Sequence, residues 1–157
     1  MVILGIDPGT TTTGFGVINY NGKKSLCVDY GVIKTKPKIP QSEKLVEIYS
    51  DVLQIIKKYK PELVAIEKIF FNTNPKTVIS VSQARGVCLL ACAHSNKQIF
   101  EYTPLQVKSA VCGYGRAEKN QVIYMVKNLL NLKQNPTPDD AADALAIAIC
   151  ASVSRIV

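Results

Sequence analysis

Four acidic side chains are placed where they could act together. Asp7 and Glu67 each close an apolar run typical of a buried strand, and functional side chains of α/β sheets gather at such strand ends. Asp140 and Asp143 lie three residues apart among alanines, so they share one face of a predicted helix. An acid at a strand end or in a first helical turn also has a purely structural explanation. Asp143 lacks one, because a carboxylate inside an apolar helix is costly to bury without a cation.

The chemistry that fits these acids is metal-assisted hydrolysis. Clustered carboxylates repel one another, and Mg²⁺ or Mn²⁺ is their natural counter-charge. Two such ions about 4 Å apart can activate a water, hold a phosphate and neutralise the leaving oxygen of a phosphodiester. Spacing alone does not decide whether Asp139 or Asp140 accompanies Asp143. Thr137 as a cap and Pro138 as the first helical residue would account for Asp139.

The remaining pattern predicts the elements that position these acids. Apolar periodicity and turn residues predict strands at 2–7, 14–20, 25–35, 63–67 and 99–102, and helices at 41–59, 76–95, 104–112, 118–131 and 138–154. This order indicates an α/β protein with a mixed five-stranded sheet flanked by helices, in a single domain over residues 1–157. If the strands ending at Asp7 and Glu67 are parallel neighbours, both carboxylates share one edge of the sheet.

Charge and composition favour a nucleic-acid partner. The chain has 19 basic and 12 acidic residues, and without the four acids above the remainder carries 19 − 8 = +11. A small acidic centre in a basic surround suits metal ions at the acids and phosphates along the lysines. Five cysteines without paired short spacings indicate buried apolar residues, and His94 is expected at a helix end or on the surface. With no signal peptide or membrane span, we expect a soluble, cytoplasmic protein without a membrane partner.

Several motifs in order along the chain resemble the RuvC family of crossover junction endonucleases. They are Gly5-Ile-Asp7-Pro-Gly9-Thr, Ala65-Ile-Glu67-Lys-Ile-Phe70, Ser82-Gln-Ala-Arg85-Gly86, Ala117-Glu-Lys119 and Asp140-Ala-Ala-Asp143-Ala-Leu-Ala-Ile-Ala. The resemblance implies a ribonuclease-H-like fold of the retroviral integrase superfamily. It also implies a homodimer that nicks two like-polarity strands of a Holliday junction symmetrically, leaving 5′-phosphate and 3′-hydroxyl ends, in DNA recombination and repair. The RuvA and RuvB branch-migration complex is an expected partner on the same ground.

The resemblance also assigns roles to individual residues. The acids that match the family's catalytic, metal-binding set are Asp7, Glu67, Asp140 and Asp143. The family's acid-Ala-Ala-Asp pattern selects Asp140 over Asp139, and the expected cofactor is Mg²⁺, two ions per subunit, with Mn²⁺ able to substitute. The expected DNA contacts are Phe70, a wedge against bases at the opened junction, and the basic residues Arg85, Lys108, Arg116 and Lys119. The apolar helix at 76–95 is the expected dimer interface.

Three alternatives remain open at this stage. The stretch from Gly5 to Gly14 resembles the first phosphate loop of actin-like and sugar-kinase-like ATP-binding domains, but those folds hold nucleotide between two such domains. A ribonuclease H would share the fold and act on RNA–DNA hybrids. A catalytically silent DNA-binding module would not need the four acids.

Overall fold

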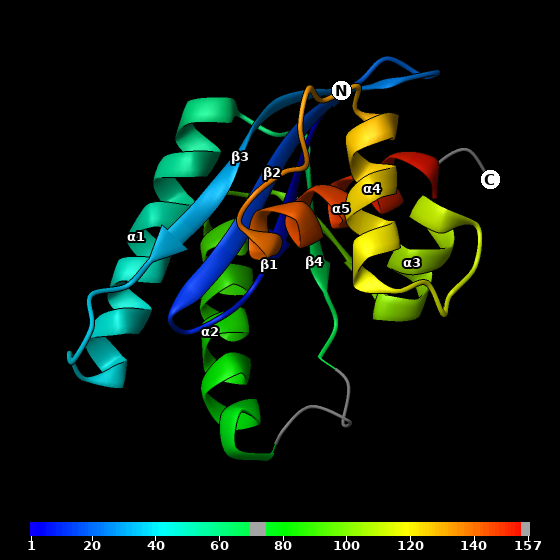
Figure 1. Cartoon of the computed structure of the whole chain (residues 1–157). Helices are drawn as coiled ribbons and strands as arrows, with labels where there is room; N and C mark the ends of the chain where they lie inside the picture. Colours follow the sequence, from blue (N-terminus) through cyan, green and yellow to red (C-terminus); the bar gives the residue numbers. More distant parts are fainter. Residues whose placement is uncertain (70–74, 155–157) are drawn as a thin grey trace.

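The computed structural model describes residues 1–69 and 75–154 (Figure 1), and its centre is one five-stranded sheet. The strand order is β3-β2-β1-β4-β5, with β1–β2 and β2–β3 antiparallel and β1–β4 and β4–β5 parallel. The strands are β1 (Val2–Asp7), β2 (Thr12–Tyr20), β3 (Ser25–Lys34), β4 (Leu63–Glu67) and β5 (Gln98–Tyr102). The predicted mixed sheet is therefore confirmed.

Helices cover both faces of this sheet (Figure 1). On one side lie α1 (Gln41–Tyr59) and α2 (Pro75–His94), and on the other α3 (Pro104–Cys112), α4 (Lys119–Leu129) and α5 (Asp139–Val153). Each face has its own hydrophobic core, one containing residues of α1 and α2 and the other residues of α3, α4 and α5. None of the helices in the described part of the chain is long and apolar enough to cross a membrane.

Side-chain alternation along β1 and β4 decides which face receives each residue. Successive side chains of a strand point to opposite faces. The core beneath α1 and α2 contains Leu4, Ile6, Val64 and Ile66, and the core beneath α5 contains Ile3, Leu63 and Ala65. The next positions on the α5 side are Asp7 and Glu67, so both carboxylates belong to the face that α5 covers.

Helix α5 lies unusually close to the sheet because glycines line its path. A Cβ atom on Gly14 would overlap the backbone oxygen of Asp140, and one on Gly5 would overlap that of Ala144. At Gly16 an added Cβ would lie only 2.7 Å from the backbone nitrogen of Leu145. Because Gly5 pairs with Gly16 in the sheet, these residues form a strip without side chains on which the helix backbone rests.

The helix starts agree with the prediction at α3 and differ at α5. Helix α3 begins at Pro104 as predicted, and Thr103 caps it through a capping box with Gln106. At α5 the N-cap is Pro138, with no side-chain capping bond, and the helix begins at Asp139, so the predicted Thr137 cap is wrong. The Pro138 carbonyl instead accepts the backbone N–H groups of residues 141 and 142. Strand β2 also begins two residues before its predicted start.

The cysteines and the histidine occupy the expected environments. All five cysteines are free thiols, with Cys88, Cys92 and Cys150 buried and the other two half-buried. His94 is the last residue of α2 and is exposed, and its Nδ1 atom shares a 2.7 Å hydrogen bond with the Tyr49 hydroxyl.

Candidate active site

Asp7 and Glu67 lie side by side at the carboxyl ends of two neighbouring strands of the sheet. Strands β1 and β4 pair in parallel with Ile6 opposite Ile66, so the residue that ends each strand follows directly after this pair. Side-chain alternation directs both carboxylates toward α5. The expectation that two parallel neighbouring strands present their terminal acids at a shared edge is therefore confirmed.

Helix α5 brings Asp140 and Asp143 to the same place. Its first turns cross β2 and β1, with the Asp140 backbone against Gly14 and the Ala144 backbone against Gly5. Asp143, one residue before Ala144, thus lies near the carboxyl ends of β1 and β4. The glycines of β1 and β2 permit this close approach, and their role was not evident from the sequence.

The four acids interact electrostatically. Burial raises the pKa of Asp7 well above its ordinary value, and repulsion from Glu67, Asp143 and Asp140 raises it further. Burial and the charge of Asp143 raise the pKa of Glu67 to about 7, against the opposing effect of two lysines. The pKa of Asp143 is raised by burial as well. Clustered carboxylates that raise one another's pKa values mark a place where added positive charge would be stabilising.

Two lysines supply part of that positive charge. The Lys119 ammonium lies 3.1 Å from Asp143 Oδ2, where it donates a hydrogen bond, and 3.3 Å from Asp139 Oδ2. Burial works against the charged form of Lys119, but these acids outweigh it and raise its pKa. Lys108 and Lys119 line a hollow of about 220 Å³ together with Glu67 and Asp143. Acids and bases that are far apart in sequence thus face one small space.

The four carboxylates are not arranged around one common metal position in this structure. Within residues 1–69 and 75–154, no three acidic, histidine or cysteine side chains are arranged as a metal cluster. Asp143 is instead turned toward Lys119. Charge repulsion acts beyond the 2.0–2.6 Å or so of a metal–oxygen bond, which is why the acids affect one another's pKa values without sharing a coordination point. Which acids bind metal therefore stays a prediction.

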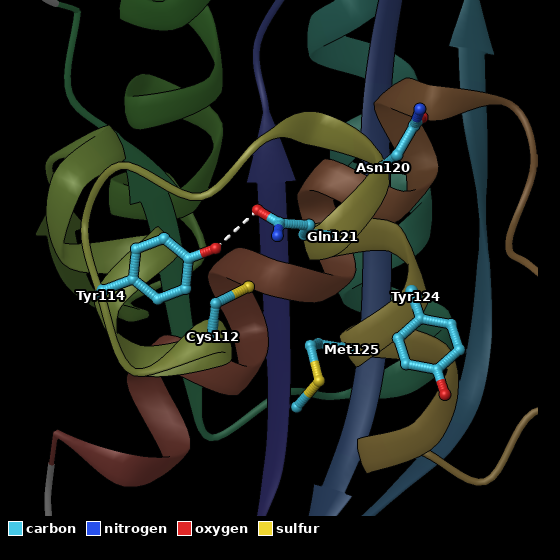
Figure 2. Close-up of a pocket in the computed structure, with 6 residues that line it drawn as sticks. All are labelled: Cys112, Tyr114, Asn120, Gln121, Tyr124 and Met125. Atoms are coloured by element: carbon cyan, nitrogen blue, oxygen red, sulfur yellow. Dashed lines mark hydrogen bonds between the residues drawn. The ribbon is translucent and has the colours of Figure 1, made fainter.

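The loop of residues 113–118, between α3 and α4, is held by hydrogen bonds to Gln121, of which Figure 2 shows the one from Tyr114. The Tyr114 hydroxyl donates to the side-chain oxygen of Gln121 at 2.6 Å, and the same oxygen accepts the Glu118 backbone N–H at 2.9 Å. Glu118 is the N-cap of α4, and Lys119 is the first residue of that helix. Arg116 lies in this loop with an exposed side chain. The network also borders a hollow of about 360 Å³ that is lined by none of the four acids.

The remaining predicted site residues lie in different surroundings. Asp139 is exposed and pairs with Lys119, and Asp140 rather than Asp139 is among the charges that raise the pKa of Asp7. Arg85 is mostly enclosed, and its guanidinium contacts protein groups, which sequence reasoning did not foresee. Phe70 lies outside the described residues.

A five-stranded mixed sheet with acids at the ends of two central strands and on a crossing helix places the protein in the ribonuclease-H-like fold class. Residues 3–151 match the family described as crossover junction endodeoxyribonuclease RuvC. The chain belongs to the RuvC family, whose members are divalent-metal-dependent nucleases. This membership decides against the ATP-binding, ribonuclease H and catalytically silent alternatives.

Curated relatives carry the same description over nearly their whole length. The crossover junction endodeoxyribonuclease RuvC of Alkaliphilus metalliredigens is 57% identical over 150 residues, which are 96% of this chain and 92% of that protein. The enzyme of Pelotomaculum thermopropionicum is 53% identical with the same coverage.

Solved structures agree with this assignment. The Thermus thermophilus RuvC structure superposes with a TM-score of 0.91 at 39% identity, covering 99% of this chain and 96% of that one. The same protein in complex with a Holliday junction substrate gives a TM-score of 0.89 at 36% identity with the same coverage. The yeast mitochondrial Holliday junction resolvase Ydc2, at 14% identity and a TM-score of 0.69, shares the fold.

Proposed function

We propose that this protein resolves Holliday junctions by hydrolysing one phosphodiester bond in each of two like-polarity strands, leaving 5′-phosphate and 3′-hydroxyl ends. The observation that carries the proposal is the convergence of acids from β1, β4 and α5 with Lys108 and Lys119, within a family of crossover junction endodeoxyribonucleases. A relative 36% identical was solved with a Holliday junction substrate, which supports a four-way junction as the DNA that is bound.

We propose further that Asp7, Glu67, Asp140 and Asp143 hold Mg²⁺, two ions per subunit, and that Mn²⁺ can substitute. The donor set fits, because all four ligands are hard carboxylate oxygens and their mutual repulsion favours bound cations. When bound, such ions supply an activated water and neutralise charge on the reacting phosphate. The chain's own part is to hold four carboxylates on two strand ends and one helix, where backbone packing limits their movement.

The basic residues around the acids would hold the DNA backbone. Lys108 and Lys119 face the same hollow as Glu67 and Asp143, so their ammonium groups are placed to neutralise a phosphate next to the acids. Lys119 would exchange its contact with Asp143 for the incoming phosphate. Arg116 is exposed on the neighbouring loop and would contact the DNA backbone at a phosphate further along the strand. Phe70 is proposed as the wedge against unpaired bases, on the family resemblance alone.

The partners follow from the reaction. Symmetric cutting of two strands requires two active sites, so we propose a homodimer with α2 at its interface. Ile79 and Leu90 on this helix are exposed hydrophobic residues, 70% and 48% accessible. Handover from the RuvA and RuvB complex, and a cytoplasmic location with access to cellular DNA, are proposed on the family resemblance.

The decisive experiment compares a synthetic four-way junction with a linear duplex and an RNA–DNA hybrid in the presence of Mg²⁺. We expect paired, symmetric nicks in the junction alone, and we expect Asp7→Asn to abolish them while junction binding persists. Asp51→Asn, an acid-to-amide change on α1 across the sheet, is the matched control and should cleave normally. An intact junction beside a degraded hybrid would overturn the proposed substrate.

A further inference from the structure

Arg85 occupies an enclosed position on α2. Its neighbours on the helix include Ala84 and Cys88, which are buried against the sheet. Only 18% of the Arg85 side chain is exposed. A guanidinium removed from water to this extent is costly unless its N–H groups are paired. Its partners within the protein therefore indicate what it does.

Those partners lie on two neighbouring strands. The Arg85 Nε–H donates to the backbone carbonyl oxygen of Glu67 at 3.0 Å, and the guanidinium forms an ion pair with the Glu101 carboxylate. Glu67 ends β4, and Glu101 lies in β5, one residue before the strand's end. The Arg85 side chain thus links α2 to β4 and β5 near the carboxyl ends of these strands, where the acids lie.

The Glu67 carbonyl group lies at the end of β4, where pairing with the neighbouring strand β1 has stopped. The last pair of the β1–β4 ladder is Ile6 and Ile66, so Glu67 itself is not paired with β1. On the other side Glu67 pairs with Tyr102, whose carbonyl accepts the Lys68 backbone N–H at 2.8 Å. Arg85 adds a hydrogen bond where the chain leaves the strand, next to the carbon atom that bears the Glu67 side chain.

We propose that Arg85 is a positioning residue that fixes the Glu67 backbone, and through it the Glu67 carboxylate, for metal binding. This inference rests on the proposed function and replaces the sequence-based interpretation of Arg85 as a DNA contact. Its effect is geometric, because the charges that act on the Glu67 carboxylate come from Asp143, Lys108 and Lys119. Glu101 neutralises the guanidinium and holds its plane so that Nε faces the Glu67 carbonyl.

The fork of the arginine side chain is necessary for this arrangement. A terminal nitrogen of the guanidinium pairs with the Glu101 carboxylate while Nε–H donates to the Glu67 backbone oxygen, and the planar group keeps these two directions fixed. A lysine at position 85 would have one nitrogen for both partners. Arg85→Lys therefore keeps the charge but loses the fixed geometry, whereas Glu101→Gln keeps the arginine and loosens its orientation.

The test measures Mn²⁺ binding to the DNA-free protein by calorimetry and junction binding separately by gel shift without divalent metal. We expect Arg85→Met and Arg85→Lys to bind Mn²⁺ about 10- to 100-fold more weakly than wild type, the usual effect of removing a group that orients a ligand. Junction affinity should change by less than about twofold, since no phosphate contact is lost. Arg116→Met, the comparator, should weaken junction binding and leave Mn²⁺ binding unchanged.

The opposite pattern would overturn the inference. If Arg85→Met bound Mn²⁺ as wild type does and lost junction affinity with a smaller salt dependence, Arg85 would be a DNA contact. If Arg85→Met failed to fold, Glu101→Gln decides: weaker Mn²⁺ binding supports positioning, whereas Mn²⁺ binding equal to that of wild type refutes it. The Mn²⁺ measurement needs no cleavage, so a wild type that left junctions intact would refute the proposed function without touching this inference.

Discussion

The Glu67 carboxyl group should make the stability of the metal-free protein fall as the pH rises. Its pKa is about 7 in the folded protein against an ordinary 4.5, chiefly because burial disfavours the charged form and Asp143 repels it. Between these two values the folded protein holds a proton that the unfolded chain has released. The free energy of unfolding therefore decreases as the pH rises through this window.

The size of the effect follows from the two pKa values. The difference between about 7 and 4.5 corresponds to about 3 kcal/mol lost above the window. With EDTA present, we predict that wild type is less stable at about pH 8 than at about pH 5, and that Glu67→Gln loses up to this amount of the difference. Glutamine has nearly the same shape and carries no charge at either pH. Urea unfolding followed by circular dichroism measures the difference directly.

Glu43→Gln is the matched control, because Glu43 is an exposed glutamate in the first turn of α1. It should retain the full pH dependence of wild type. Equal pH dependence in Glu67→Gln and wild type would show that Glu67 does not hold its proton in the folded protein. Saturating Mg²⁺ should reduce the wild-type difference, since a bound cation replaces the proton as the counter-charge.

Three further predictions concern packing, charge and capping. Gly14→Ala forces a methyl group against the Asp140 backbone and should cost about 1–3 kcal/mol or more in urea unfolding. Gly86→Ala, where an added Cβ meets nothing within 4 Å, should instead add about 0.5–1 kcal/mol. Lys119→Met removes the cation beside Asp143, so single-turnover cleavage at saturating protein should slow about 10²- to 10³-fold; a normal rate would exclude Lys119 from the chemistry. Thr103→Val breaks the α3 capping box and should lower unfolding free energy by about 0.5–2 kcal/mol, which Thr103→Ser should largely restore.

The strand-end acids were predictable because they depend on local pattern. An apolar run that stops at Asp7 and another that stops at Glu67 are visible in the sequence, and parallel pairing then places both at one edge. The face of α5 that carries Asp140 and Asp143 follows from helical spacing in the same way. Family motifs added the choice of Asp140 over Asp139, and the charges that raise the pKa of Asp7 agree with that choice.

The role of Arg85 was not predictable because it depends on partners distant in sequence. Its contacts with Glu67 and Glu101 require knowing that α2 crosses the ends of β4 and β5, which no local pattern reveals. A basic residue in a DNA-binding protein favours a phosphate contact until its burial is known. Metal identity, the dimer and the single-domain organisation stay predictions.

The contact between α5 and the glycine strip has a consequence for biosynthesis. Asp7 is translated before Asp140 and Asp143, which follow the five strands and helices α1 to α4 in the chain. A nascent or truncated chain without α5 lacks two of the four acids and leaves the glycine strip open. If the four acids act together as proposed, nuclease activity would arise only after α5 has packed on the glycine strip.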